Sequence, residues 1–205
     1  MKITKLLIIT ILFFSNYLMA TEEPDFNLIF KKENFEIREY APKILAQVEV
    51  EAGFKDASTK GFKLLADYIF GNNSTLDGSQ KIDMTTPVVL EPKSELIDMT
   101  TPIILEGSDR RWVVSFVMPK EYSIKTLPKP NNKDIKIIRQ PKEKYAVIVF
   151  SGLVSDSNYK EQSVLLNTFI NDSNLKKIGH LQIARYNPPW TLPFFRRNEL
   201  MVKIN

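Results

Sequence analysis

The residues best suited to binding chemistry gather near the C-terminus, in the stretch ARYNPPWTLPFFRRNE (184–199). Three prolines fix its path, so Trp190 and Phe194 should stand on a rigid loop with Arg196 and Arg197 beside them. Apolar side chains rimmed by cations suit an amphiphilic anion, such as a porphyrin with its propionates, or a membrane surface. The alternative is that the aromatic side chains cover one end of the core and the arginines stay in water.

A near-duplicate occupies the middle of the chain, where residues 82–92 read IDMTTPVVLEP and residues 97–107 read IDMTTPIILEG. Apolar residues alternate in both copies, which predicts two extended strands joined by a turn. The proline in each copy places these strands at a sheet edge or a bulge. One interpretation is that the hairpin supplies core side chains. The other is that Met84 and Met99, soft and adaptable, line a pocket for a flat apolar ligand.

Single ionisable residues offer further candidates. His180 is the only histidine, and it could ligate iron or act as a base, although a histidine near a turn is also simply solvated. Glu39, Tyr40, Tyr68 and Tyr186 are candidate polar groups of a pocket, where a buried Glu39 with a nearby tyrosine could catalyse hydrolysis of a small molecule by general acid and base chemistry. This hydrolase hypothesis predicts that burial raises the pKa of Glu39.

Composition excludes several classes of function. The chain has 205 residues, of which 43% are hydrophobic and 25% charged, enough for one sizeable core. The net charge of +4 comes without a block of lysine or arginine, so we expect no nucleic-acid partner. The absence of cysteine excludes disulfides, thiolate zinc sites and a cysteine nucleophile. No phosphate-binding loop, dinucleotide glycine motif or nucleophile elbow occurs.

The N-terminus has the pattern of a secretory signal peptide. Residues 1–20 combine a positive start, a short apolar run and a small final residue. We expect cleavage after Ala20 and export, most simply to the periplasm, with a retained N-terminal anchor as the alternative. Residues 21–25 then form a linker, and residues 26–205 form a single domain.

Hydrophobic periodicity predicts the elements that position these residues. Helices are expected at 56–70 and 159–170, the first with Asp56 as a cap, Gly71 as a stop and Gly61 where the helix approaches the sheet closely. Strands are expected at 35–40, 44–51, 111–118, 135–140, 145–151, 182–186 and 199–204. Two strand-strand-helix-strand halves joined by the connector 127–132 predict an α+β fold, in which quasi-repeated halves form an antiparallel barrel-like sheet with two packed helices.

Several stretches together resemble the SOUL haem-binding protein family. They are FEIREYAP (35–42), FKDASTKGFKLLADYIFGNN (54–73), KIDMTTPV (81–88), VSFVMPKEY (114–122), TLPKPNN (126–132), VIVFSGL (147–153) and ARYNPPWTLPFFRRNE (184–199). They occur in the family's order and cover nearly all of residues 26–204. The resemblance implies a pseudo-symmetric α+β fold related to bacterial small-molecule effector-binding domains. It also implies non-enzymatic binding of haem or a related tetrapyrrole in a hydrophobic pocket.

The resemblance also bears on iron ligation. Some animal members of the family carry a histidine, proposed as the iron ligand, where this chain has Glu39, and a carboxylate is a poor substitute for imidazole. Non-covalent capture through apolar and propionate contacts fits this chain better, with His180 as the one candidate metal ligand. The residues expected to contact the ligand are Met84, Met99, Tyr40, Trp190, Phe194, Arg196 and Arg197. A hydrolase of the same fold and an envelope module that contacts a membrane or partner are the alternatives.

Overall fold

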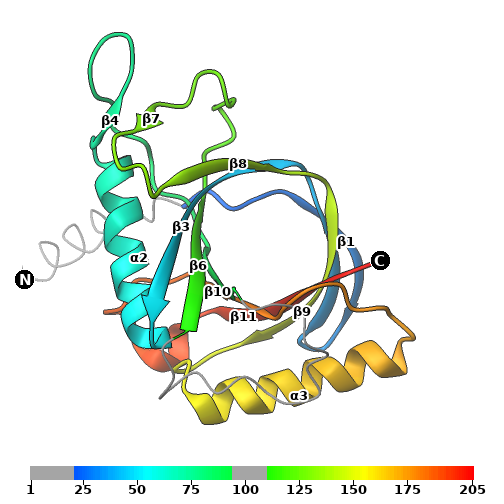
Figure 1. Cartoon of the computed structure of the whole chain (residues 1–205). Helices are drawn as coiled ribbons and strands as arrows, with labels where there is room; N and C mark the ends of the chain where they lie inside the picture. The colour runs from blue at the N-terminus through cyan, green and yellow to red at the C-terminus, as the bar shows by residue number, and fades with distance from the viewer. Residues whose placement is uncertain (1–20, 94–109) are drawn as a thin grey trace, which may run out of the picture.

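One antiparallel sheet curls into an open ring, and two helices lie on the outside of that ring (Figure 1). The computed structural model describes residues 21–93 and 110–205. Within these ranges the sheet has nine strands in the order β1-β2-β9-β11-β10-β5-β6-β3-β8, and its end strands β1 and β8 do not pair. The expected α+β fold with a barrel-like sheet and two helices is confirmed. The quasi-repeat of two halves is not confirmed and stays a prediction.

The elements of the ring agree with most of the expected ranges. The strands are β1 (Phe26–Lys32), β2 (Phe35–Tyr40), β3 (Lys43–Ala52), β5 (Val88–Pro92), β6 (Arg110–Val117), β8 (Lys136–Gln140), β9 (Glu143–Phe150), β10 (Gln182–Arg185) and β11 (Asn198–Ile204). The helices are α2 (Phe54–Ile69) and α3 (Asp156–Asp172). A small two-stranded sheet of β4 (Asn73–Ser74) and β7 (Lys129–Pro130), and the 3-10 turn η1 (Pro193–Phe195), complete the set. The sequence did not predict strands β1, β4 and β7.

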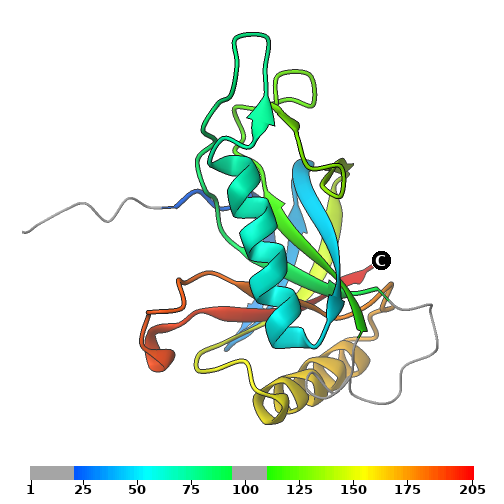
Figure 2. The ribbon, with the colours of Figure 1, turned by 60° about the vertical axis from the view of Figure 1, so that its left-hand side comes forward.

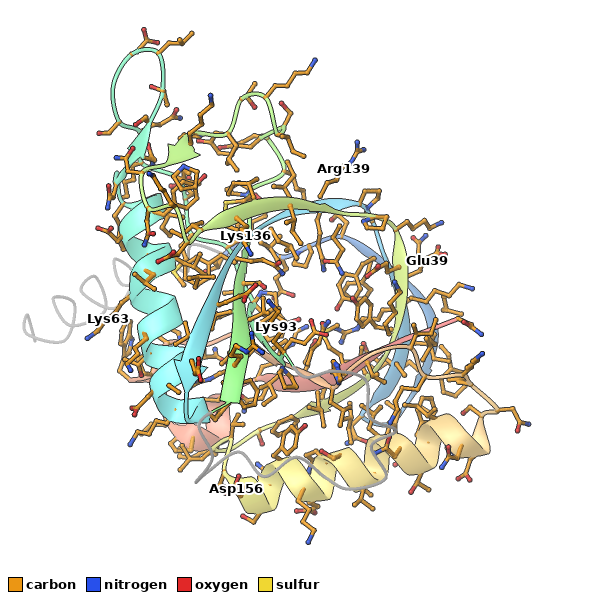
Figure 3. All side chains as sticks on the ribbon, viewed as in Figure 1. Glu39, Lys63, Lys93, Lys136, Arg139 and Asp156 are labelled. Atoms are coloured by element: carbon orange, nitrogen blue, oxygen red, sulfur yellow. The ribbon has the colours of Figure 1, made fainter. Side chains whose placement is uncertain are left out.

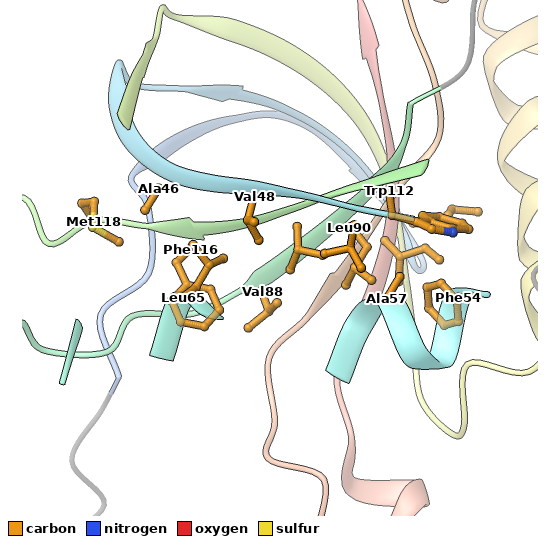
Figure 4. Close-up of a cluster of buried hydrophobic side chains, with 14 of the residues drawn as sticks. Ala46, Val48, Phe54, Ala57, Leu65, Val88, Leu90, Trp112, Phe116 and Met118 are labelled. Carbon is orange, nitrogen blue, oxygen red and sulfur yellow. The ribbon is translucent and has the colours of Figure 1, made fainter. Parts of the chain in front are cut away.

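Alternation along the strands separates an apolar outer face from an inner face on which charged side chains stand beside a second, smaller hydrophobic cluster. Arg38 of β2 pairs with Tyr145 of β9, and Tyr145 pairs with Lys203 of β11, so these side chains share the inner face of the ring. Their neighbours in sequence, such as Ile37 and Ala146, face outward against the helices. The main hydrophobic core therefore lies between the helices and the outside of the sheet, where Figure 4 shows part of it.

Helix α2 packs closely on this outer face, as the sequence predicted for Gly61. A Cβ added at Gly61 would lie 2.6 Å from Val114 Cβ, so only glycine fits there. The helix begins at Phe54 with Gly53 as its N-cap, so the prediction that Asp56 caps it was wrong and Asp56 lies in the first turn. Gly71, with a φ of 124°, follows the end of the helix as expected.

Helix α3 begins after Ser155, whose side chain accepts a hydrogen bond from the backbone N–H of Asn158 at 3.3 Å. Leu166 and Ile170 are buried as predicted, whereas Leu165 is exposed, which corrects its expected inward position. Neither α2 nor α3, nor any other helix among the residues described, is long and apolar enough to cross a membrane.

The first copy of the near-duplicate is only partly a strand. Residues 88–92 form β5, but residues 82–87 follow an irregular path that contains a cis peptide bond between Thr86 and Pro87. Ile82 is buried there, and the Thr85 hydroxyl donates a hydrogen bond to the Val117 carbonyl, so local tertiary contacts replace the predicted ladder. The second copy, with Met99, lies outside the described residues, as does the expected signal peptide.

Candidate functional site

A buried ion-pair network fills one part of the inner face. Arg38 is 2% exposed and Glu199 is fully buried, and they form two hydrogen bonds, Nη1 to Oε2 at 2.7 Å and Nη2 to Oε1 at 3.0 Å. Arg38 also donates from Nε to Glu36 at 2.6 Å and from Nη1 to the Tyr40 hydroxyl at 2.9 Å. Burial would lower the pKa of Arg38, but its contacts with Glu199 and Tyr40 outweigh burial and raise it. Arg38 is therefore a permanent charge.

Glu199 has no acceptor position left for a ligand. Tyr186 donates its hydroxyl to Glu199 at 2.8 Å, and Arg197 donates from Nη2 at 2.7 Å and from Nε at 3.0 Å. The Arg197 guanidinium also lies 3.8 Å above the Tyr186 ring and pairs with Glu23 at 3.0 Å. Two of the predicted ligand contacts, Tyr40 and Arg197, thus take part in a network that braces the sheet.

A second set of hydrogen-bonded polar side chains, centred on Glu143, lies on the inner face. Glu143 accepts hydrogen bonds from Tyr145 at 2.8 Å, from Gln140 at 2.7 Å and from Lys203 at 2.6 Å. Burial would raise the pKa of Glu143, but these hydrogen bonds and the charge of Lys203 lower it. The inside of the ring is therefore occupied by paired protein groups, and a ligand site must be sought at its ends or outside.

A pocket of about 460 Å³ opens at the end of the ring where β2 turns into β3. The N-terminal segment and the chain that follows β6 form its walls, and its apolar surface includes Ile44, Met118 and Ile124. The lining consists of residues 22–25, 41–44, 117–120 and 122–125, with Thr85 and Arg139. A volume of this size lies within the range of about 300–1,000 Å³ that small-molecule sites occupy.

The N-terminal wall of the pocket is firmly attached to the domain. The Glu22 carbonyl accepts a hydrogen bond from the Thr86 N–H at 2.9 Å, and the Glu22 carboxylate accepts one from the Lys120 backbone N–H at 2.9 Å. The Lys120 ammonium pairs with Asp25 at 2.7 Å, and the Asp25 carbonyl accepts from the Ala41 N–H at 3.0 Å. Residues 22–25 therefore form a built wall, while the domain boundary expected at residue 26 stays a prediction.

Both cations and carboxylates line the pocket, the carboxylates being those of Glu22, Glu23 and Asp25. Lys43, Lys125 and Arg139 line it, and within residues 21–93 and 110–205 none of them forms an ion pair. Burial lowers the pKa of Lys43 to about 8 against the opposing charge of Glu143, and its Nζ lies 4.2 Å from the centre of the Tyr40 ring, so its ammonium faces the inner network. Arg139 stands at the outer edge of β8 (Figure 3). A carboxylate bound here would meet Lys125 and Arg139, which form no ion pair among the described residues.

The pocket therefore fits a flat amphiphile with carboxylate groups. Its apolar walls suit a macrocycle, and its free cations suit propionates. In the part of the chain that the structure describes, no three His, Asp or Glu side chains group as a metal site. His180 lies before β10, away from the pocket, so the geometry favours capture without it.

The predicted contact residues are not brought together. Trp190 and Phe194 are exposed on the loop before β11, where Arg196 donates from Nε to the Thr191 carbonyl at 2.7 Å. Met84 is partly buried against the core between helix and sheet. Tyr40 and Arg197 belong to the inner network. The role of this set in ligand binding stays a prediction.

The structure contradicts the expected state of Glu39. A hydrogen bond from Lys142, with an Nζ to Oε2 distance of 2.8 Å, is the main cause that lowers the pKa of Glu39. Glu39 also lies on the opposite face of β2 from Tyr40, because successive side chains of a strand alternate. The expectation of a pKa raised by burial was wrong, and these two residues cannot act on one substrate.

Sequence reasoning missed the cations of the pocket because they lie far apart in the chain. A signal was nevertheless present, because FEIREYAP and VSFVMPKEY, two of the segments that carry the family resemblance, end at this pocket. The first supplies Ala41 and Pro42, and the second supplies residues 117–120 with Tyr122.

Comparison with known proteins agrees with this reading of the fold. A family model described as "SOUL heme-binding protein" matches residues 21–203. A search of curated proteins finds no match. Among solved structures, the C-terminal domain of EcmrR is similar with a TM-score of 0.62 at 7% identity, over 83% of this chain and 96% of that chain. A hydrolase from Listeria innocua is similar with a TM-score of 0.57 at 11% identity, over 86% and 94%. At these identities the likeness shows the fold alone.

Proposed function

The chain belongs to the SOUL haem-binding protein family, and we propose that it binds haem or a related tetrapyrrole non-covalently in the pocket at the end of the ring, without turnover. The family supports a tetrapyrrole ligand. The observation that carries the location is the pocket of about 460 Å³, which has apolar walls and two cations, Lys125 and Arg139, without an ion pair among the described residues.

In this proposal the macrocycle lies against Ile44, Met118 and Ile124, and its carboxylates face Lys125 and Arg139. When bound, haem supplies an iron centre. The chain supplies apolar cover and countercharge.

The proposal also includes export, which rests on the signal-peptide pattern of residues 1–20. An exported tetrapyrrole binder would act in the periplasm. Cell fractionation, with N-terminal sequencing of the purified protein, tests this part: a mature chain that starts at Thr21 in the periplasmic fraction supports it, and a full-length cytoplasmic chain overturns it.

Hemin titration of residues 21–205, followed by absorbance, tests the pocket. The double variant Lys125→Met/Arg139→Gln should bind hemin at least about tenfold more weakly than wild type, because two charge-assisted contacts are lost. His180→Ala and Trp190→Ala should bind as wild type does. Saturable binding that survives in the double variant but is lost in Trp190→Ala would place the site at the loop that carries Trp190. Absence of saturation in wild type would overturn the function itself.

A matched pair of ligands separates charge from apolar contact. Protoporphyrin should bind wild type more tightly than its dimethyl ester, because only the free acid carries carboxylates. The double variant should bind both equally. Equal binding of the two ligands by wild type would show that Lys125 and Arg139 do not face the carboxylates.

A further inference from the structure

A cluster of exposed apolar side chains stands on the loop of residues 188–196, called here the aromatic loop. Trp190 is 82% exposed, Phe194 64% and Phe195 69%. Leu192 of the same loop is exposed as well. Leu153 is also exposed, and the N–H of its neighbour Gly152 donates a hydrogen bond to the Pro193 carbonyl at 2.9 Å. A contiguous apolar cluster of this kind marks an interaction surface.

The aromatic loop is held in shape by its own backbone. Arg196 donates to the carbonyls of Thr191 and Pro189. The Thr191 N–H donates to the Pro188 carbonyl at 3.0 Å, and the Phe195 N–H donates to the Leu192 carbonyl at 3.0 Å. These bonds and the three prolines fix the loop while its apolar side chains point into water. The exposure is thus a feature of an ordered segment.

Two arginines without acidic partners lie beside this loop. Arg185, at the end of β10, donates to the Ser58 hydroxyl of α2 at 3.2 Å, and neither Arg185 nor Arg196 forms an ion pair within the ranges described. Burial, and then the charge of Arg196, lowers the pKa of Arg185, so the two guanidiniums are close enough to repel. Lys63 points outward from α2 (Figure 3).

We propose that the aromatic loop docks the protein onto an anionic phospholipid membrane, with Trp190 and the two phenylalanines in the interfacial layer and the arginines facing lipid phosphates. A membrane fits better than a protein partner because the apolar side chains stand on a projecting tip, as Figure 2 shows for the turn η1, and not in a groove. The combination of aromatic and cationic side chains is typical of interfacial binding.

This surface is separate from the pocket at the end of the ring. No residue of the aromatic loop lines that pocket, whose walls come from the N-terminal segment and the chain after β6. The proposal therefore stands apart from tetrapyrrole binding. Membrane docking would hold the pocket near a bilayer, where amphiphilic ligands partition.

Vesicle co-sedimentation tests the proposal. Wild type should pellet with phosphatidylcholine vesicles that contain about one quarter phosphatidylglycerol, and less with phosphatidylcholine alone. Trp190→Ala/Phe194→Ala should reduce the partition coefficient at least about tenfold, because two interfacial aromatic side chains are removed. Leu76→Ala, at a fully exposed apolar residue on a different turn, is the matched control and should change nothing. Arg185→Gln should reduce binding only to the anionic vesicles.

Tryptophan fluorescence gives an independent readout. The chain has two tryptophans, and Trp112 is buried in the core, so a blue shift on addition of vesicles reports on Trp190. Equal pelleting of wild type and the double variant, or no blue shift, would overturn the proposal. A self-association that the double variant abolishes, without any vesicle binding, would overturn it in favour of a protein contact. The Lys125→Met/Arg139→Gln variant should still bind vesicles.

Discussion

Replacing Gly61 by alanine should destabilise the protein, although alanine is the better helix former. The added Cβ would lie 2.6 Å from Val114 Cβ and 3.0 Å from its Cγ1. Rotation of the valine cannot relieve the first contact, because Cβ does not move with χ1. Val114 is also fully buried and paired on both sides, with Val48 of β3 and Leu90 of β5.

The magnitude follows from two opposing effects. Overpacking a well-filled core usually costs about 1–3 kcal/mol, and a contact with an immobile strand falls at or above the upper end. Alanine in place of glycine inside a helix contributes about 1 kcal/mol in favour of folding. We expect the free energy of unfolding to fall by about 2 kcal/mol. With a urea dependence of about 2 kcal/mol per molar, the midpoint should fall by about 1 M.

Urea denaturation followed by circular dichroism measures this difference. Gly53→Ala is the matched control, because a Cβ there meets nothing within 4 Å and its φ is −61°, so the change should stay below about 1 kcal/mol. Gly61→Ala/Val114→Ala should be less destabilised than the sum of the two single variants. A midpoint for Gly61→Ala equal to or above that of wild type would refute the close approach of α2 to β6.

Further predictions concern the charged residues. Arg38→Met should lower the free energy of unfolding by about 3 kcal/mol in urea, since it removes a partner of buried Glu199, and a loss below about 1 kcal/mol would contradict this. Lys43 has a pKa of about 8 when folded against an ordinary 10.5, so the unfolded chain binds more protons between these values and stability should rise with pH across that window. Lys43→Met should flatten this rise, and parallel curves would refute it. Burial would raise the pKa of Glu36, but its hydrogen bonds from lysine and arginine lower it. Wild type should therefore lose stability below about pH 4.5 more steeply than Glu36→Gln, which acid denaturation of the two proteins measures.

The secondary structure could be predicted from the sequence wherever one face of an element is buried. Strand β2 alternates strictly between the helix side and the inside of the ring, so its period identified it. Strand β1 was missed because it lies at an edge and six of its seven residues are exposed, which leaves no burial pattern to read. In residues 82–87 the alternation misled, since Thr85 is buried by a hydrogen bond to a distant strand.

The candidate site was less predictable because its charges are set by long-range partners. Arg196 and Arg197 are adjacent and looked equivalent in the sequence. The structure turns Arg197 toward Glu199 and Glu23, and leaves Arg196 to bond the backbone of its own loop. The cations of the pocket come from three separate elements, so no local motif could join Lys43, Lys125 and Arg139.

The wall that residues 22–25 give to the pocket decides where an affinity tag can be attached. A polyhistidine tag joined ahead of Thr21 would begin next to Glu22, which is bonded to Thr86 and Lys120 at the pocket. Imidazole is a common ligand of haem iron, so such a tag would offer axial ligands at the rim and imitate binding by the protein. Asn205 follows β11 and does not line the pocket, so a tag at the C-terminus keeps the titration a measure of the chain itself.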